Sequence, residues 1–221
     1  MKREIEVTND GSHTLFVPEL NEHYHSTNGA IDEARHVFIN SALAHCAKKN
    51  INVLEIGFGT GLNALLTMIE ADIKELSINY TSLELFPVDM SDVELLNFAE
   101  LIDNATHELF IDLHYAHWNK SQAITPNFML HKMNTDFRKV ESTIFDDKFD
   151  VVYFDAFGPD KQPDMWRSDL FEKLYASMND GGIITTYSAK GSIRRMMQSI
   201  GFMVERLPGP IGKREMLRGV K

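Results

Sequence analysis

The chain has 221 residues, of which 43% are hydrophobic and 24% charged, and its formal net charge is −10. This length and composition fit one globular domain with a buried core and a small appendage. The first residues, M-K-R-E-I-E-V, lack the apolar run of a signal peptide, and no stretch approaches the roughly 20 apolar residues of a membrane span. The single cysteine, Cys46, excludes an internal disulfide. We therefore expect a cytoplasmic protein without membrane contact.

Basic residues concentrate near the end of the sequence. Residues 190–221 hold eight Lys or Arg and two Glu, a net charge of +6, which leaves −16 for the other residues. Such asymmetry on an acidic protein can mark a surface that binds nucleic acid. The alternative is that these charges are ordinary solvated side chains.

The first residues predict a β-hairpin. Asn9-Asp10-Gly11 separates the apolar runs I-E-V and T-L-F-V, which is a strong hairpin signal. We assign residues 1–30 to an N-terminal β-hairpin extension and residues 31–221 to the main domain. A helix is expected from about Ile31 to Lys48, where apolar residues recur at a spacing of three to four.

Strands and helices then alternate along the chain. The expected strands lie at 51–56, 78–85, 127–132, 149–155 and 181–188, followed by two closing strands. The expected helices lie at 62–70, after Pro87, and at 104–118, 165–178 and 189–200. This alternation predicts an α/β, doubly wound fold with a mainly parallel, seven-stranded sheet covered on both faces.

A glycine-rich loop follows the first strand of this alternation. Gly57, Gly59 and Gly61 form G-x-G-x-G directly after Glu55, and residue 62 is leucine, so the G-x-G-x-x-G of dinucleotide folds is not completed. A pyrophosphate needs a free helix N-terminus, whereas adenosylmethionine carries no phosphate. Its amino and carboxylate groups need an acid and backbone amides, which suits Glu55. The loop therefore favours S-adenosylmethionine over a dinucleotide.

Two further acids stand at expected strand ends. Glu84 ends the second strand, where a carboxylate can bind both ribose hydroxyls of a nucleoside. Asp155 follows five hydrophobic residues at the end of the fourth strand, beside the expected cofactor pocket. Phe157 and Trp166 offer apolar or stacking surface in the loop after it. As alternatives, Asp155 could cap a helix and Trp166 could belong to the core.

The loop at 155–166 carries a family resemblance. Its sequence, D-A-F-G-P-D-K-Q-P-D-M-W, resembles the D-x-F-x-P-x-K-x-P-x-M-W signature of the MnmC methyltransferase domain and its stand-alone relatives, called MnmD. Further matches are H-Y-H-S-T-N-G-A-I-D-E-A-R-H-V-F (23–38), G-F-G-T-G-L-N (57–63), S-L-E-L-F-P (82–87), A-K-G-S-I-R-R (189–195), S-I-G-F (199–202) and G-K-R-E-M-L-R-G-V (212–220). The resemblance implies a Rossmann-like, class I S-adenosylmethionine-dependent methyltransferase.

The resemblance also implies a substrate. These proteins methylate the aminomethyl group of the wobble uridine in certain tRNAs, so the expected partner is the anticodon region of tRNA. Asp155 would orient the substrate amine, accept its proton and border the cofactor, while Phe157 and Trp166 would exclude water. The family's bifunctional members carry a C-terminal flavin oxidase domain, which no part of this sequence could encode. Where the family has a Gly-Asp pair at the adenine, this sequence has Met133-Asn134, and we expect Asn134 to take that contact.

The remaining expectations concern RNA and metal. Arg194 and Arg195 would begin a helix and Lys213 and Arg214 would lie on a closing strand, so that together with Lys161 they could contact RNA phosphates at one rim of the pocket. No metal site is expected, because the histidines lack ligands at metal-binding spacing. The alternatives are a methyltransferase for a protein or small-molecule amine, a dinucleotide-dependent oxidoreductase and a non-catalytic binding module.

Overall fold

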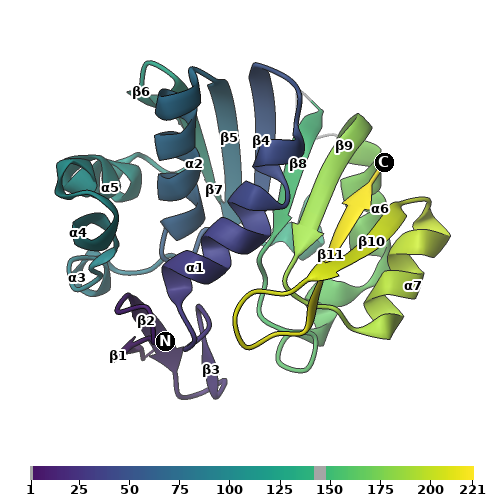
Figure 1. The fold of residues 1–221 in the computed structure, drawn as a ribbon, viewed down its shortest axis with the longest axis horizontal. Coiled ribbons are helices and arrows are strands. Elements are labelled where there is room, and N and C mark those ends of the chain that lie inside the picture. The colour runs from purple at the N-terminus through teal and green to yellow at the C-terminus, as the bar shows by residue number, and fades with distance from the viewer. Residues whose placement is uncertain (1, 142–147) are drawn as a thin grey trace.

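A twisted central sheet organises the computed structural model, which describes residues 2–141 and 148–221. The sheet has eight strands, of which five run parallel in the centre and three pair antiparallel at the two edges (Figure 1). In sheet order they are β10 (Met203–Pro208), β11 (Glu215–Val220), β9 (Met178–Thr186), β8 (Phe149–Phe154), β4 (Asn50–Ile56), β5 (Ser77–Glu84), β7 (Phe128–Asn134) and β6 (Ser121–Thr125).

Helices cover both faces of this sheet, as β8 demonstrates. All six of its residues are buried, because successive side chains point to opposite faces and both faces carry helices. Val151 and Tyr153 pack in the core beneath one set of helices, and Val152 and Phe154 pack in a second core on the other face. The first set includes α1 (Ala30–Ala34), α2 (Leu62–Lys74), α3 (Met90–Val93), α4 (Phe98–Ile102) and α5 (His107–Tyr115), and the second comprises α6 (Ser168–Ser177) and α7 (Gly191–Ile200).

The N-terminal residues form a separate small sheet below the carboxyl ends of the central strands (Figure 1). It consists of β1 (Glu4–Val7), β2 (His13–Val17) and β3 (Glu22–His23), all antiparallel. The hairpin expected around Asn9-Asp10-Gly11 is present, with Gly11 at a φ of 83°. The third strand is too short for its sequence pattern to predict.

The helix expected at 31–48 is broken. Regular α-helix ends at Ala34, a π-helical turn occupies Arg35–Asn40, and a short 3-10 turn follows. Val37, Phe38 and Ile39 in the π-helical turn are all buried in the core. The Ser41 hydroxyl donates to the carbonyl of His36 at 2.7 Å and occupies the acceptor that a longer helix would use.

Two other expectations differ from the structure. The sheet has an eighth strand, β6, which pairs with the edge of β7. Its partly exposed sequence S-Q-A-I-T has no clear alternation of apolar and polar residues, so the sequence did not predict it. Pro87 lies before α3 and outside its first turn. The carbonyls of Phe86 and Pro87 instead accept from the Arg3 guanidinium at 3.2 Å, which joins β1 to this segment. No helix among the described residues has both the length and the apolarity to cross a membrane.

Candidate active site

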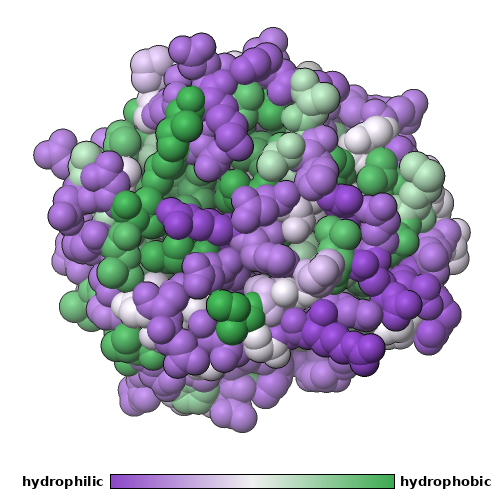
Figure 2. Space-filling view, in the orientation of Figure 1, coloured by the Kyte–Doolittle hydropathy of each residue, from purple (hydrophilic) through white to green (hydrophobic). Residues whose placement is uncertain are grey.

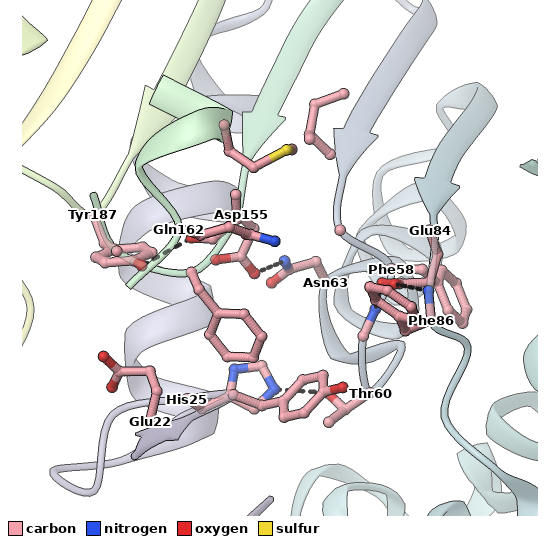
Figure 3. A pocket seen from close by; sticks show the side chains of 18 of the residues that line it. Glu22, His25, Phe58, Thr60, Asn63, Glu84, Phe86, Asp155, Gln162 and Tyr187 are labelled. Carbon is pink, nitrogen blue, oxygen red and sulfur yellow. Dashed lines mark hydrogen bonds between the residues drawn. The ribbon is translucent and has the colours of Figure 1, made fainter. Parts of the chain in front are cut away.

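A cavity of about 580 Å³ opens where the central parallel strands end (Figure 3). This volume is typical of sites for small molecules and cofactors. Its walls come from the loop after β4, the end of β5, the loop after β8, the N-terminal sheet and the loop between β10 and β11. The carboxyl ends of parallel strands are where open α/β sheets bind ligands, so the cavity lies where the sequence predicts it.

The glycine loop forms one wall of the cavity, and its glycines bring the main chain to the cavity lining. Gly57 and Gly59 line the cavity with positive φ angles of 98° and 50°. A Cβ on Gly57 would lie 2.7 Å from the main-chain oxygen of Asp155, so only glycine lets these two loops pack together. Gly61 is the N-cap of α2 and stands outside the cavity lining.

Glu84 faces the cavity at the end of β5. Its Oε2 accepts from the backbone N–H of Gly59 at 3.0 Å, and its Oε1 accepts from that of Phe86 at 2.8 Å (Figure 3). A carboxylate offers about four lone-pair positions, so these two bonds fix its orientation and leave acceptor capacity for a ligand. The expected role of Glu84 at the ribose fits this geometry.

Asp155 is half-buried at the first position after β8 and lines the cavity. Its Oδ2 accepts from Nδ2 of Asn63 at 2.8 Å (Figure 3). Burial raises the pKa of the Asp155 carboxyl to about 7. A carboxyl group with this pKa is a much stronger proton acceptor than an ordinary aspartate.

Glu55 lies deeper than the sequence predicts. Its side chain is fully buried and is absent from the cavity lining. Asn63 donates to its Oε1 at 3.0 Å and Ser82 donates to its Oε2 at 2.6 Å. Burial raises the pKa of Glu55 to about 8. Because the next residue, Ile56, is the one that reaches the cavity, Glu55 acts on the cavity only through Asn63.

Asn134 is not placed to contact an adenine in the cavity. Its side chain is exposed, and its Nδ2 donates to the carbonyls of Glu84 and Leu85 at 2.9 and 3.3 Å, which ties the ends of β7 and β5 together. The residues after it, Thr135 and Asp136, line the cavity instead. Strand β7 continues to Asn134, so the chain turns toward the cavity later than the family's Gly-Asp pair predicts.

Phe157 and Trp166, in the loop after β8, have different positions relative to the cavity. Phe157 lines the cavity and packs edge-to-face against Tyr24, with ring centroids 5.3 Å apart. Trp166 is 5% exposed and belongs to the core, where it packs against Phe154. Its Nε1 donates to the carbonyl of Phe157 at 2.8 Å, so Trp166 supports the cavity wall from behind. Direct contact between Trp166 and a ligand is not what this geometry provides.

A second wall, which adjoins the glycine loop at Thr60, contains residues to which the sequence assigned no role. Tyr24 and His25 come from the N-terminal segment, Glu33 from α1 and Tyr187 from the end of β9. Burial lowers the pKa of His25 to about 4, and its Nε2 lies 2.6 Å from Oγ1 of Thr60 in the glycine loop. The segment H-Y-H-S-T-N-G was a signal for this wall, but only the fold shows what it faces.

Lys213 reaches this wall as well. It lies in the loop between β10 and β11 and not on a closing strand, because β11 begins only at Glu215. Its Nζ lies 4.0 Å from the centroid of the Tyr187 ring and 2.5 Å from Oε1 of Glu33. Of the five expected RNA-contacting residues, Lys213 is the one that lines the cavity.

The other basic residues lie outside the cavity lining. Lys161 donates to the carbonyls of Leu20 and Asn21 at 3.1 and 2.8 Å and so holds the N-terminal segment. Arg194 and Arg195 lie on α7, and Arg214 follows Lys213. Figure 2 shows hydrophilic side chains over the part of this face formed by α7 and the β10–β11 hairpin. Half of the eight basic residues in 190–221 form ion pairs, namely Lys190–Asp160, Arg206–Glu215, Lys213–Glu33 and Arg218–Glu205.

Within residues 2–141 and 148–221, no group of three or more His, Cys, Asp or Glu is arranged to hold a metal ion. Histidines stand close together at two places in the sequence, His23 with His25 and His114 with His117, and one member of each pair contacts Thr60. His25 bonds Thr60 as described, and His114 places its Nε2 3.1 Å from the Thr60 carbonyl. Burial lowers the pKa of His114 to about 4, so this imidazole is neutral at physiological pH.

Comparison with known proteins identifies the family. A model described as S-adenosyl-L-methionine-dependent methyltransferase matches residues 100–221. The tRNA 5-methylaminomethyl-2-thiouridine biosynthesis bifunctional protein MnmC of Burkholderia multivorans is 30% identical over 223 residues, which cover 93% of this chain and 33% of that protein. The MnmC of Ectopseudomonas mendocina is 30% identical over 218 residues, covering 89% of this chain and 32% of that protein. The chain thus spans about a third of the length of the curated relatives it matches.

Solved structures agree with this assignment. The crystal structure of MNMC2 from Aquifex aeolicus superposes with a TM-score of 0.84 and 26% identity, covering 99% of this chain and 70% of that chain. Spermidine synthase from Thermotoga maritima, at 11% identity and a TM-score of 0.55, covers 98% of this chain and 71% of that chain and shares the fold alone. The family match favours a methyltransferase over the alternative of a dinucleotide-dependent oxidoreductase. The chain belongs to the S-adenosyl-L-methionine-dependent methyltransferase family, as its resemblance to the MnmC methyltransferase domain predicts, and S-adenosylmethionine is its cofactor.

Proposed function

We propose that this methyltransferase acts on the aminomethyl group of the wobble uridine in tRNA and converts 5-aminomethyl-2-thiouridine to 5-methylaminomethyl-2-thiouridine. The observation that carries the proposal is one cavity in which a cofactor wall with Gly57 and Glu84 meets the half-buried Asp155, a proton acceptor with a raised pKa. The names of the MnmC relatives point to the same reaction. In this proposal residues 1–30 are an extension that completes the substrate side of the cavity formed by residues 31–221.

The residues of the cavity fit S-adenosylmethionine. Gly57 and Gly59 bring the main chain itself to the cavity lining, and Glu84 retains acceptor capacity for the ribose hydroxyls. Thr135 and Asp136 border the side of the cavity where the adenine would lie. When bound, this cofactor supplies a methyl group that its sulfonium already activates, so the protein needs no acid for the leaving thioether.

The protein must instead supply a neutral amine in line with the methyl group. An alkylammonium has a pKa near ~10 in water, as lysine does. An ordinary aspartate is a poor base for such a group, because its pKa lies far below that of the amine. Burial raises the pKa of Asp155 to about 7, which brings it closer to the pKa of the amine. Asp155 would thus orient the nitrogen and accept its proton, while Phe157 and Tyr24 keep water from this side of the cavity.

The anionic substrate requires a basic surface on an acidic protein. We propose that Arg194, Arg195 and Arg214 contact phosphates of the anticodon region and that Lys161 supports the N-terminal segment beside it. These three arginines form no ion pair among the described residues, in contrast to half of their basic neighbours. Phosphate contacts position RNA without reading its sequence.

Incubation with methyl-labelled S-adenosylmethionine tests the function. The acceptors are tRNA from a strain lacking this gene, a protein mixture and small amines, and the products are digested and identified by mass spectrometry. We expect one labelled methyl group on the aminomethyl nitrogen of the wobble uridine and none on the other acceptors. Label on protein or on a small amine instead would replace this proposal with the alternative methyltransferase.

A further inference from the structure

Asn63, the second residue of α2, joins Asp155 in the cavity to Glu55 buried beneath it. It lines the cavity, is 3% exposed and uses Nδ2 twice, donating to Glu55 Oε1 at 3.0 Å and to Asp155 Oδ2 at 2.8 Å. Figure 3 shows its amide facing the Asp155 carboxylate. An amide nitrogen has two hydrogens, so both are committed to protein acceptors.

The other end of the same amide has no partner. Oδ1 of Asn63 is buried and accepts no hydrogen bond in the structure. The two donations from Nδ2 decide which end of the amide faces the acids, so Oδ1 is held as a fixed acceptor beside Asp155. Burying an acceptor without a donor costs free energy, and such orphaned atoms in native proteins call for an explanation. A ligand that donates an N–H to this oxygen provides that explanation.

We infer that Asn63 Oδ1 and the Asp155 carboxylate together accept the two N–H bonds of a primary amine and so limit the reaction to one methyl group per nitrogen. This inference rests on the proposed function, and it adds the class of amine and the residue that selects it. Asn63 would touch the substrate, whereas Glu55 would be a positioning residue that acts through Asn63.

The chemistry of a primary amine suits two acceptors. The neutral nitrogen carries one carbon substituent, two N–H bonds and one lone pair. With both N–H bonds accepted, the lone pair is left to point at the methyl group. The nitrogen would then form a bond to the methyl carbon as the carbon–sulfur bond breaks, and one proton would leave the nitrogen for the Asp155 carboxylate, which has first passed to solvent the proton that it took from the alkylammonium. The products are a secondary amine and the neutral thioether.

A secondary amine does not satisfy the same pair. It has a single N–H when neutral, so its methyl group would have to occupy the place of the other hydrogen. Either the Asn63 oxygen or the Asp155 carboxylate would then remain buried without a donor. Sites built to bind an N–H or O–H reject analogues that lack it far more strongly than apolar pockets reject a methylene. The first methylation therefore discourages the second.

The buried position of Glu55 follows from the same arrangement. Its Oε1 receives one hydrogen of the Asn63 amide, and Ser82 holds its other oxygen at 2.6 Å. Without this acceptor the amide could turn over and present its nitrogen to the cavity. Glu55 beneath the wall is thus needed to keep the oxygen of the Asn63 amide, and not its nitrogen, turned toward the cavity.

Binding measurements test the inference independently of turnover. Two anticodon stem-loops, one with 5-aminomethyluridine and one with 5-methylaminomethyluridine at the wobble position, are titrated by calorimetry in the presence of S-adenosylhomocysteine at a pH of ~10, where about half of each amine is neutral. We expect the wild-type protein to prefer the primary amine by about tenfold. The preference should fall to near unity in Asn63→Leu, which keeps the shape of the side chain without its polar atoms, and mass spectrometry should detect dimethylated product.

Two further variants protect this test from trivial outcomes. Thr67→Val, also buried in α2 and bonded to the Asn63 carbonyl, is the matched control and should retain the wild-type preference. Should Asn63→Leu fail to fold, Asn63→Ser replaces it and should show the same loss of preference. An unchanged preference in a folded Asn63 variant overturns the inference and leaves the proposed function standing.

The cofactor's own α-ammonium is the other possible N–H donor. Calorimetry with S-adenosylhomocysteine and its deaminated analogue separates the two sources. If Asn63 binds the substrate, the ratio of the two affinities is the same in wild type and Asn63→Leu. If that ratio collapses in the variant, Oδ1 accepts from the cofactor and the inference is wrong. If the wild-type protein neither binds nor methylates the primary-amine stem-loop, the proposed function fails first.

Discussion

The two walls of the cavity are built in different ways. The cofactor wall consists of residues directly after consecutive parallel strands, with Gly57 and Gly59 after β4 and Glu84 at the end of β5. The second wall gathers residues from distant segments, such as Tyr24 and Lys213. The first wall can be predicted from short motifs because neighbouring strand ends must meet. The second exists only because the N-terminal sheet and the β10–β11 hairpin fold back onto the same edge.

This contrast suggests a division of labour, with binding of the cofactor on one wall and selection of the substrate on the other. Asp155 and Asn63 lie where the walls meet, and Glu55 lies beneath them. Changes to each wall should therefore affect different measurements.

The largest effect is expected at the junction. Asp155→Asn should reduce single-turnover methylation by roughly 10²–10⁴-fold, because the proton acceptor is lost, while the affinity for S-adenosylhomocysteine stays near that of wild type. Kinetics and calorimetry on the same preparation check both parts. Partial recovery of activity at high pH, where the free amine is neutral, would strengthen the assignment. Equal losses of turnover and cofactor affinity would instead place Asp155 on the cofactor wall.

Glu55→Gln should change the pH dependence of stability. The pKa of Glu55 is about 8 in the folded protein against an ordinary value of 4.5, so its charged form is disfavoured by folding. In wild type the resulting penalty is absent below about pH 4.5, grows as the pH rises and is complete above about pH 8. Glutamine cannot ionise, so the variant should gain on the order of a few kcal/mol relative to wild type between pH 5 and 9.

Denaturant unfolding at several pH values measures this difference. Asp155 ionises in both proteins, so most of its contribution cancels and the difference between the two curves reports chiefly on Glu55. Parallel stability curves for wild type and Glu55→Gln would show that this acid is already charged in the folded protein or exposed to water.

Glu84→Ala should affect the cofactor wall alone. Loss of a charged acceptor for the ribose should weaken S-adenosylhomocysteine binding by about 1.5–3 kcal/mol, or about 10–100-fold. Part of this loss would come from the Gly59 and Phe86 amides that the carboxylate now holds. Stem-loop binding without cofactor should be unchanged. Unaltered cofactor affinity in calorimetry would remove Glu84 from the site.

The smallest effects are expected at the basic surface. Arg195→Ala should flatten the salt dependence of tRNA binding by roughly 0.7 in the logarithmic slope, the contribution of one phosphate contact to a single strand. Lys213→Ala should in addition weaken binding of the isolated modified nucleoside, because Lys213 lines the cavity and Arg195 does not. If the Arg195→Ala/Lys213→Ala double variant binds tRNA with wild-type affinity and wild-type salt dependence, these residues are solvated surface and RNA docks elsewhere.

Local sequence patterns determined the positions of the sheet's central strands along the chain and the motifs at their ends. A run such as F-D-V-V-Y-F can only be a strand buried on both faces, and an acid directly after it must emerge at the ligand-binding edge, as Asp155 does. The glycines at 57 and 59 were predictable for a similar reason, since a turn with positive φ follows the strand. These features depend on residues within one strand and its adjoining loop.

Tertiary structure decided the depth and partners of the remaining site residues. Whether an acid near a strand end faces the cavity, as Glu84 does, or the interior, as Glu55 does, depends on the alternation of side chains relative to a cavity that other segments close. Trp166 supports the wall from behind because the core beside β8 has space for its ring. Asn63 became the link between two acids only when α2 packed beneath both, since hydrogen bonds between distant segments leave no periodic trace in a sequence.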